Sequence, residues 1–125
     1  MSIKGIGTDL LDQNRIENAV ERQGDRFAKR ILSPQEFTVW VERDYSINYL
    51  AKRFAAKEAI AKALGTGIAK GVGFQQMSIS SDAAGKPVVT LSGQALSRAQ
   101  DLGGKEVMLS LSDEGAMILA FAILS

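Results

Sequence analysis

The segment from Phe54 to Gly67 constrains the fold of this chain more than any other stretch. It consists mainly of Ala, Lys, Glu and Leu, which favour helix, and the run stops at Gly65, a residue type that commonly ends helices. On a helix with 3.6 residues per turn, Glu58 lies within about 60° of a largely apolar stripe. That stripe comprises Ile47, Ala51, Phe54, Ala55, Ala61 and Lys62.

Two interpretations follow from this placement of Glu58 and Lys62. A charged side chain within an apolar stripe is costly to bury unless it is paired or binds a metal. The two residues either form an ordinary i,i+4 ion pair on a partly hydrated helix, or belong to a functional site held against the core. Three other cations, Lys52, Arg53 and Lys57, are predicted about 100–140° from Glu58, off the stripe.

Composition limits the chemistry that the chain can perform. Its 125 residues are 46% hydrophobic and carry a net charge of +1, so we expect one globular domain over residues 1–125 and no nucleic-acid partner. The absence of cysteine and histidine excludes disulfides, thiol nucleophiles, histidine bases and histidine-bound zinc. The absence of cysteine also fits a reducing compartment, and the longest apolar run is too short to cross a membrane. Catalysis must therefore rest on carboxylates, lysine, arginine, the backbone or a hard metal ion.

Hydrophobic periodicity and turn signals predict a mixture of strands and helices. Strands are expected over residues 3–10, 77–81, 88–91, 107–112 and 116–124, and helices over 12–23, 25–32, from 34 onward, 46–64 and 92–102. Ser33, Pro34 and Glu36 fit a capping box, Asp25 is expected to cap the helix that follows it, and Trp40 is expected in the core. The unbroken apolar run 116–124 indicates a strand buried on both faces.

Two glycine-containing segments are candidates for binding. Gly5 and Gly7 would let another backbone or a ligand approach the first strand closely, and Asp9 shares their face of the strand. Asp9 is either a site residue or an ordinary turn or cap residue. The glycine-rich loop that starts at Gly65 and continues to Gly73 would offer backbone N–H groups to a phosphate, although the pattern by itself favours a plain helix C-cap and turn.

The chain resembles the holo-acyl-carrier-protein synthases, the small bacterial 4′-phosphopantetheinyl transferases, over essentially its full length. The motifs that carry this resemblance are Gly5-Ile6-Gly7-Thr8-Asp9 with Arg15, Phe54-Ala55-Ala56-Lys57-Glu58-Ala59 with Lys62, Gly65-Thr66-Gly67, Gly85-Lys86-Pro87, and the Ser110-Leu111-Ser112 strand. The resemblance implies an α+β fold: a single small domain with a mostly antiparallel sheet packed against helices. It also implies a cytoplasmic homotrimer with active sites at subunit boundaries.

The activity implied by the resemblance is transfer of the 4′-phosphopantetheine arm of coenzyme A to a serine of apo-acyl carrier protein, in fatty acid biosynthesis, with release of adenosine 3′,5′-bisphosphate. Asp9 and Glu58 match the magnesium ligands of the family and Lys62 a lysine near the diphosphate, so these three would be catalytic. Either Asp9, through a water, or Glu58 would accept the serine proton. Coenzyme A would contact Arg53, Lys62, Gly65, Thr66, Gly67, Lys86 and Pro87. The acidic carrier protein would dock on the segment from Arg15 to Arg30, through Arg15, Arg22 and Arg26, although the residues by themselves favour an ordinary solvated face.

One position departs from the family pattern. Many members carry histidine after the Ser-x-Ser strand, whereas this chain has Asp113, which would not bind a phosphate without a cation between them. Two other functions account for parts of the pattern: a different magnesium-dependent phosphohydrolase or nucleotidyl enzyme, and a binding module in which Glu58 and Lys62 are only structural. Transfer of the pantetheine arm to a protein distinguishes the transferase from both of these functions.

Overall fold

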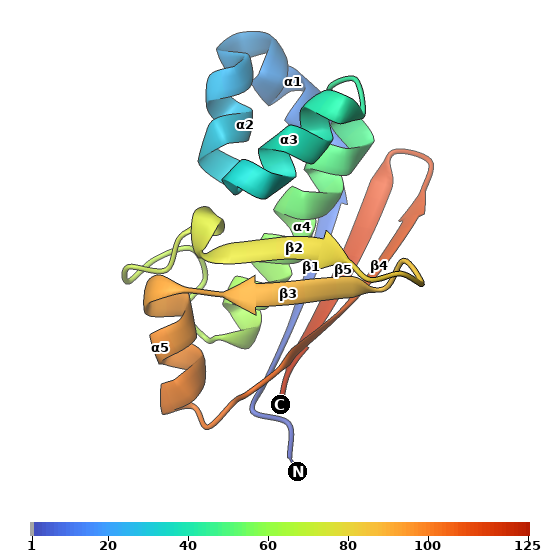
Figure 1. Cartoon of the computed structure of the whole chain (residues 1–125). Helices are drawn as coiled ribbons and strands as arrows, with labels where there is room; N and C mark the ends of the chain where they lie inside the picture. The colour runs from blue at the N-terminus through green and yellow to red at the C-terminus, as the bar shows by residue number, and fades with distance from the viewer. Residues whose placement is uncertain (1) are drawn as a thin grey trace.

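The computed structural model describes residues 2–125, which form an α+β domain (Figure 1). The elements in chain order are β1 (Gly5–Asp12), α1 (Gln13–Gln23), α2 (Asp25–Ile31), α3 (Pro34–Glu42), α4 (Ile47–Ala63), the short 3₁₀ helix η1 (Phe74–Gln76), β2 (Met77–Ser81), β3 (Pro87–Leu91), α5 (Gly93–Asp101), β4 (Val107–Glu114) and β5 (Met117–Leu124). This order confirms the predicted sequence of strands and helices, and the observed ends of these elements differ from the predicted ones by a few residues.

The strands form two antiparallel sheets. One has the order β1-β5-β4, and the other is the β2-β3 hairpin. Helix α4 runs along the three-stranded sheet, α1, α2 and α3 gather at one end of the molecule, and α5 lies toward the other end, near the two chain termini (Figure 1). The fold therefore agrees with the predicted class, and α4 is the element against which the other layers pack.

Strand β1 approaches α4 so closely that only glycine fits at two positions. A Cβ atom added at Gly5 would lie 1.8 Å from the backbone oxygen of Ala63, and one added at Gly7 would lie 2.0 Å from the oxygen of Ala59. No real Cβ comes that close to a carbonyl oxygen, so the two glycines bring strand and helix backbones into direct contact. The predicted close approach is confirmed, with α4 as the partner.

Helix α4 is buried on nearly all sides, which the single-stripe prediction missed. Lys57, predicted off the apolar stripe, is 0% exposed and lies in the core. Lys62, predicted within the stripe, is instead the one residue of α4 that is exposed. The sheet covers one side of α4, while α1, α2 and β2 pack on its other sides. A stripe calculated from helical periodicity therefore does not identify the buried side chains.

Strand β5 was predicted to be buried on both faces, and this is wrong for the single chain. Ile118, Ala120, Ala122 and Leu124 point toward α4 and are buried. The alternate residues, paired with β1 and β4 by the strand register, make an outer face that helices do not cover: Ile6, Leu10, Met108, Met117, Leu119, Phe121 and Ile123. We refer to these residues as the outer sheet face.

Smaller differences concern caps and edges. Gly24, not Asp25, is the N-cap of α2, and Asp25 lies in its first turn. The capping box of Ser33 and Glu36 is present, and Trp40 is buried as predicted. Asp113 and Glu114 belong to β4 rather than to the following turn, because their backbones continue to pair with β5.

Candidate active site

The crossing of β1 and α4 brings Asp9, Glu58 and Lys62 together. The Nζ of Lys62 donates hydrogen bonds to the backbone oxygen of Thr8, at 2.9 Å, and to Oδ1 of Asp9, at 3.3 Å. Glu58 lies one helical turn before Lys62 on α4 and faces the same strand. The direct backbone contact at Gly7, two residues before Asp9, sets the separation of strand and helix at this point.

The electrostatics of Glu58 indicate that its carboxylate and that of Asp9 act on each other. Burial raises the pKa of Glu58 above its usual value, and the Asp9 carboxylate raises it further, whereas Lys62 and Arg15 oppose the shift. Within residues 2–125, Lys62 forms its ion pair with Asp9 and not with Glu58. The simple i,i+4 pair proposed as an alternative from the sequence is therefore not formed.

A divalent cation fits this pair of carboxylates. The described residues contain no cluster of three or more acidic, histidine or cysteine side chains, so a metal would have only Asp9 and Glu58 as carboxylate ligands. Mg²⁺ typically binds one or two carboxylates and completes its shell with waters and phosphate oxygens. The mutual repulsion that raises the pKa of Glu58 is the kind that a bound cation relieves.

The glycine loop after α4 forms a helix C-cap. The N–H of Gly65 donates to Lys62 O, and those of Thr66 and Gly67 both donate to Ala61 O. The amides predicted to face a phosphate thus serve to close the helix end. Arg98 of α5, which the sequence gave no reason to select, adds a cation here, since its Nε donates to Leu64 O at 2.8 Å.

Arg53 lies in a different groove, of about 420 Å³, on another side of α4. The groove brings together Arg53, Gly85 and Pro87, which the sequence placed in one coenzyme A site, and it also contains Arg43 and Ser110. Lys86 lies between Gly85 and Pro87 on the β2–β3 turn, and its N–H donates to Asp82.

Asp113, the residue that replaces the common histidine, is held by two residues of α4. Its carboxylate accepts a hydrogen bond from Asn48 at 3.2 Å and pairs with the ammonium of Lys52 at 3.5 Å. A cation therefore stands beside this aspartate, on the side of α4 that also lines the groove of Arg53.

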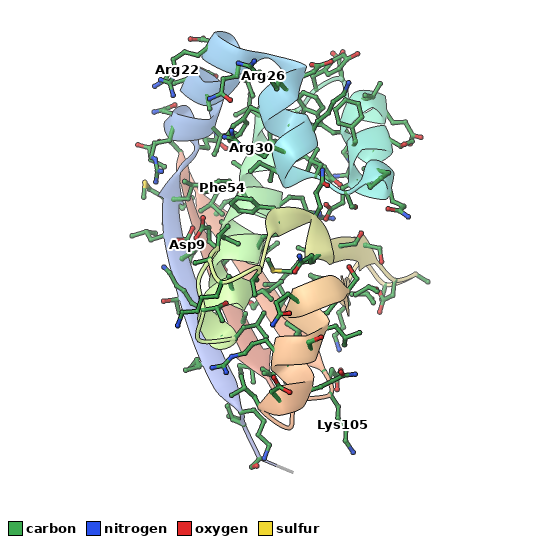
Figure 2. All side chains as sticks on the ribbon, turned by 90° about the vertical axis from the view of Figure 1, so that its left-hand side faces the viewer. Asp9, Arg22, Arg26, Arg30, Phe54 and Lys105 are labelled. Atoms are coloured by element: carbon green, nitrogen blue, oxygen red, sulfur yellow. The ribbon has the colours of Figure 1, made fainter. Side chains whose placement is uncertain are left out.

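The cations of α1 and α2 form a third feature, above Asp9 in the view of Figure 2, where Arg22, Arg26 and Arg30 are labelled. Arg15, Arg22 and Arg30 line a groove of about 300 Å³ whose floor includes Phe27 and Phe54. The groove does not include Arg26. The structure thus joins two of the three docking residues, Arg15 and Arg22, with Arg30, the last cation of the same predicted segment.

Sequence reasoning missed the buried ion pair of Glu36 and Lys57. The Nζ of Lys57 donates to Glu36 Oε1, and neither side chain is more than 1% exposed. Because Glu36 fits a capping box, the sequence gave it a sufficient local role, and no local pattern indicated a partner 21 residues away.

The family model described as the 4′-phosphopantetheinyl transferase superfamily matches residues 5–118, and the chain belongs to this family. It is of the holo-[acyl-carrier-protein] synthase type. A holo-[acyl-carrier-protein] synthase of Shewanella amazonensis is 52% identical over 124 residues, 99% of each chain. The crystal structure of the Neisseria meningitidis synthase has a TM-score of 0.91 at 46% identity and covers 99% of both chains. The Helicobacter pylori synthase in complex with coenzyme A has a TM-score of 0.83 at 31% identity and covers 96% of this chain and 99% of that chain.

Proposed function

We propose that this chain transfers the 4′-phosphopantetheine arm of coenzyme A to a serine of apo-acyl carrier protein, the reaction that its family membership indicates. The observation that carries the assignment of the site is the convergence of Asp9, Glu58 and Lys62 where β1 crosses α4. Two carboxylates and an ammonium suit a reaction in which a diphosphate must be held and its charge neutralised.

The three side chains divide two roles between them. Asp9 and Glu58 would hold Mg²⁺, which when bound would draw charge from the diphosphate oxygens. The Lys62 ammonium donates to Thr8 and Asp9, but its side chain is 51% exposed, so the phosphate that leaves with the nucleotide can also reach it. The serine oxygen forms the new bond to the phosphorus that carries the pantetheine arm, and the serine proton passes to Glu58 or, through a water, to Asp9. The bond from that phosphorus to the bridging oxygen breaks, and adenosine 3′,5′-bisphosphate leaves.

The nucleotide end of coenzyme A belongs in the groove of Arg53, Gly85 and Pro87. Arg43, Lys52 and Arg53 line this groove, and Lys86, between Gly85 and Pro87 in the chain, would add a further positive charge for a phosphate. Arg53 and Glu58 are five residues apart, about 140° around the helix, so the groove and the metal pair face different sides of α4. One coenzyme A molecule reaches both the groove and the carboxylates of Asp9 and Glu58 most simply if the groove of one subunit faces those carboxylates on its neighbour. Thr66, Gly65 and Gly67 then line the path between them.

The working form is a homotrimer in the cytoplasm, and the outer sheet face supplies its interface. On β1, Ile6 is 59% exposed and Leu10 is 65% exposed, and Leu119, opposite Leu10 on β5, is 46% exposed. Exposed aliphatic side chains that are contiguous across three strands are unusual on a monomer and typical of an interface. Three copies around an axis close such contacts cyclically. None of the helices in residues 2–125 has the length and apolar composition needed to cross a bilayer.

The carrier protein docks on the groove of Arg15, Arg22 and Arg30. Arg26 lies outside this groove, on the same helix as Arg30, and adds positive charge near it. The cations attract an acidic helix, and Phe27 and Phe54 provide an apolar floor. Because charges at a rim mainly affect association, Arg15→Glu or Arg26→Glu should raise KM for carrier protein and leave KM for coenzyme A nearly unchanged. An equal rise in both constants would argue against docking at this surface.

The deciding experiment is incubation with coenzyme A, Mg²⁺ and apo-acyl carrier protein, followed by mass spectrometry of the carrier protein. We expect the mass of the pantetheine arm to be added by the wild type. Asp9→Asn and Glu58→Gln should each lose at least about 10²-fold in rate, whereas the exposed Asp101→Asn, at the end of α5, is the matched control.

Two outcomes would contradict the proposal. Cleavage of coenzyme A without modification of the carrier protein would identify a phosphohydrolase. Absence of transfer by the wild type, with every other measured function retained by Glu58→Gln, would identify a binding module in which that carboxylate is structural.

A further inference from the structure

The carboxylate of Glu36 joins four segments of the chain in the core. Its Oε1 accepts from the N–H of Ser33 and from the ammonium of Lys57. Its Oε2 accepts from the N–H of Ile79, at the centre of β2, at 2.8 Å. A capping box requires only one oxygen of the carboxylate, so the second oxygen serves a purpose beyond the end of α3.

The partner of Glu36 is equally well satisfied. Lys57 is fully buried, and its Nζ also donates to the backbone oxygen of Ile31 at 2.7 Å. Burial lowers the pKa of Lys57, and the Glu36 carboxylate opposes that shift. The pair is therefore neutral as a unit. The two hydrogen bonds to Oε1 and the one from Ile79 to Oε2 fix the orientation of the carboxylate.

Arg53 is the one group near this carboxylate that is incompletely satisfied. Its Nε lies 3.8 Å from Oε2 of Glu36 and is buried without a hydrogen-bond partner. Its guanidinium lies over the ring of Tyr49, 4.7 Å from the ring centroid. The side chain is only 12% exposed, yet it lines the groove that contains Gly85 and Pro87. Arg53 thus contacts Glu36 and Tyr49 on its buried side, while its remaining surface lines the groove.

We propose that Glu36 is a positioning residue for coenzyme A, which acts by fixing the guanidinium of Arg53 at the nucleotide groove. An arginine that is free to rotate loses conformational freedom when it binds a phosphate, whereas one held by a carboxylate and an aromatic ring has already lost it. The purely structural alternative is that Glu36 only caps α3 and neutralises Lys57. This inference rests on the proposed function, in which Arg53 contacts the nucleotide.

The test is a thermodynamic cycle on binding of adenosine 3′,5′-bisphosphate, measured by isothermal titration calorimetry. The variants are Arg53→Met, the double variant Glu36→Gln/Lys57→Met, and the triple variant that combines them. The double variant removes both charges of the buried pair, a replacement that often retains stability, whereas removal of one charge leaves the other uncompensated. Glu36→Gln by itself is measured in parallel, at a temperature well below its melting point, in case the double variant does not fold.

We expect Arg53→Met to weaken nucleotide binding about tenfold or more, and the double variant to weaken it at least about threefold, while the triple variant binds no more weakly than Arg53→Met. The expected coupling is non-additive because Glu36 acts only through Arg53. In the transfer assay, the double variant should raise KM for coenzyme A and leave KM for carrier protein unchanged, a separation that general destabilisation would not give.

Each other outcome is decisive. Wild-type nucleotide affinity in the double variant, with weak binding by Arg53→Met, overturns the positioning role and leaves the proposed function intact. If the double substitution weakens nucleotide binding by the same factor in Arg53→Met as in the wild type, Glu36 acts independently of Arg53. That result also overturns the positioning role. Wild-type affinity in Arg53→Met removes the nucleotide contact from the proposed function and the positioning role with it.

Discussion

Replacement of Gly7 by alanine is expected to separate β1 from α4 and thereby to move Asp9 away from Glu58. The added Cβ would lie 2.0 Å from the backbone oxygen of Ala59, whereas ordinary contact begins at 3.4 Å. The strand must therefore move by about 1.4 Å, the difference between these two distances, because the atom it meets is backbone of a buried helix and cannot yield.

The magnitude follows from this displacement. Overpacking of a core typically costs about 1–3 kcal/mol, which in a domain of this size lowers Tm by roughly 4–12 °C. A misplacement of about 1 Å at a catalytic group costs about 10²-fold in rate. Gly7→Ala should therefore reduce the transfer rate by about two orders of magnitude at temperatures where the protein remains folded.

Melting followed by circular dichroism and the mass-spectrometric transfer assay measure the two effects separately. Gly73→Ala is the matched control, since a Cβ at Gly73 meets no atom within 4 Å and its φ of −128° suits any residue. It should keep wild-type activity and gain up to about 1 kcal/mol by restricting the unfolded chain. If Gly7→Ala behaves like Gly73→Ala in both assays, the close approach does not position Asp9.

Three further predictions concern stability and assembly. Without divalent cations, Glu58→Gln should raise Tm at pH 7. Burial and Asp9 raise the pKa of Glu58 in the folded state, so the stability of the wild type falls as the pH rises from the unfolded pKa of 4.5 through the folded value. The glutamine variant does not have this loss of stability. The gain in Tm should disappear near pH 4. If the wild type and Glu58→Gln melt at the same temperature at pH 7 as well as at pH 4, the argument is contradicted. Asp44→Gly should stabilise the fold by about 1 kcal/mol in urea titrations, because its φ of +56° is unfavourable for a residue with a Cβ; a loss would show that the Asp44 side chain matters more than its backbone. Phe121→Asp should yield monomers without transfer activity in light scattering and the transfer assay, whereas Val88→Asp, on the exposed face of β3, should still assemble; a Phe121→Asp trimer would exclude the outer sheet face as the interface.

Local sequence was sufficient for the features that depend on neighbours along the chain. The capping box of Ser33 and Glu36 involves residues three positions apart, so propensity and spacing identified it. The bounds of α4 followed from a cap at Ser46 and a glycine after Leu64. The glycines of β1 indicated a close approach because nothing else explains two of them on one face of a strand, although the sequence did not indicate which element approaches.

The candidate site was recognised from the sequence only in part. Asp9, Glu58 and Lys62 were selected together, and the structure brings them together. The role of Arg98 was not predicted, because it depends on which distant element lies opposite: Arg98 closes the end of α4. Arg30 was expected only as one cation of the docking segment, and the groove that it lines with residues of α1 and α4 was not predicted.

The burial of charge was decided by tertiary structure alone. A helical stripe assumes that one side of a helix faces a core, but α4 has the sheet on one side and other helices and β2 on others. Lys57 therefore enters the core although it lies off the stripe, where Glu36 from α3 neutralises it at a separation of 21 residues. Lys62 reaches solvent from within the stripe because β1 passes it at Thr8 and Asp9, whose oxygens bind its ammonium. Propensity and periodicity act within a few residues, whereas the dielectric environment of a charge depends on every segment that packs around it.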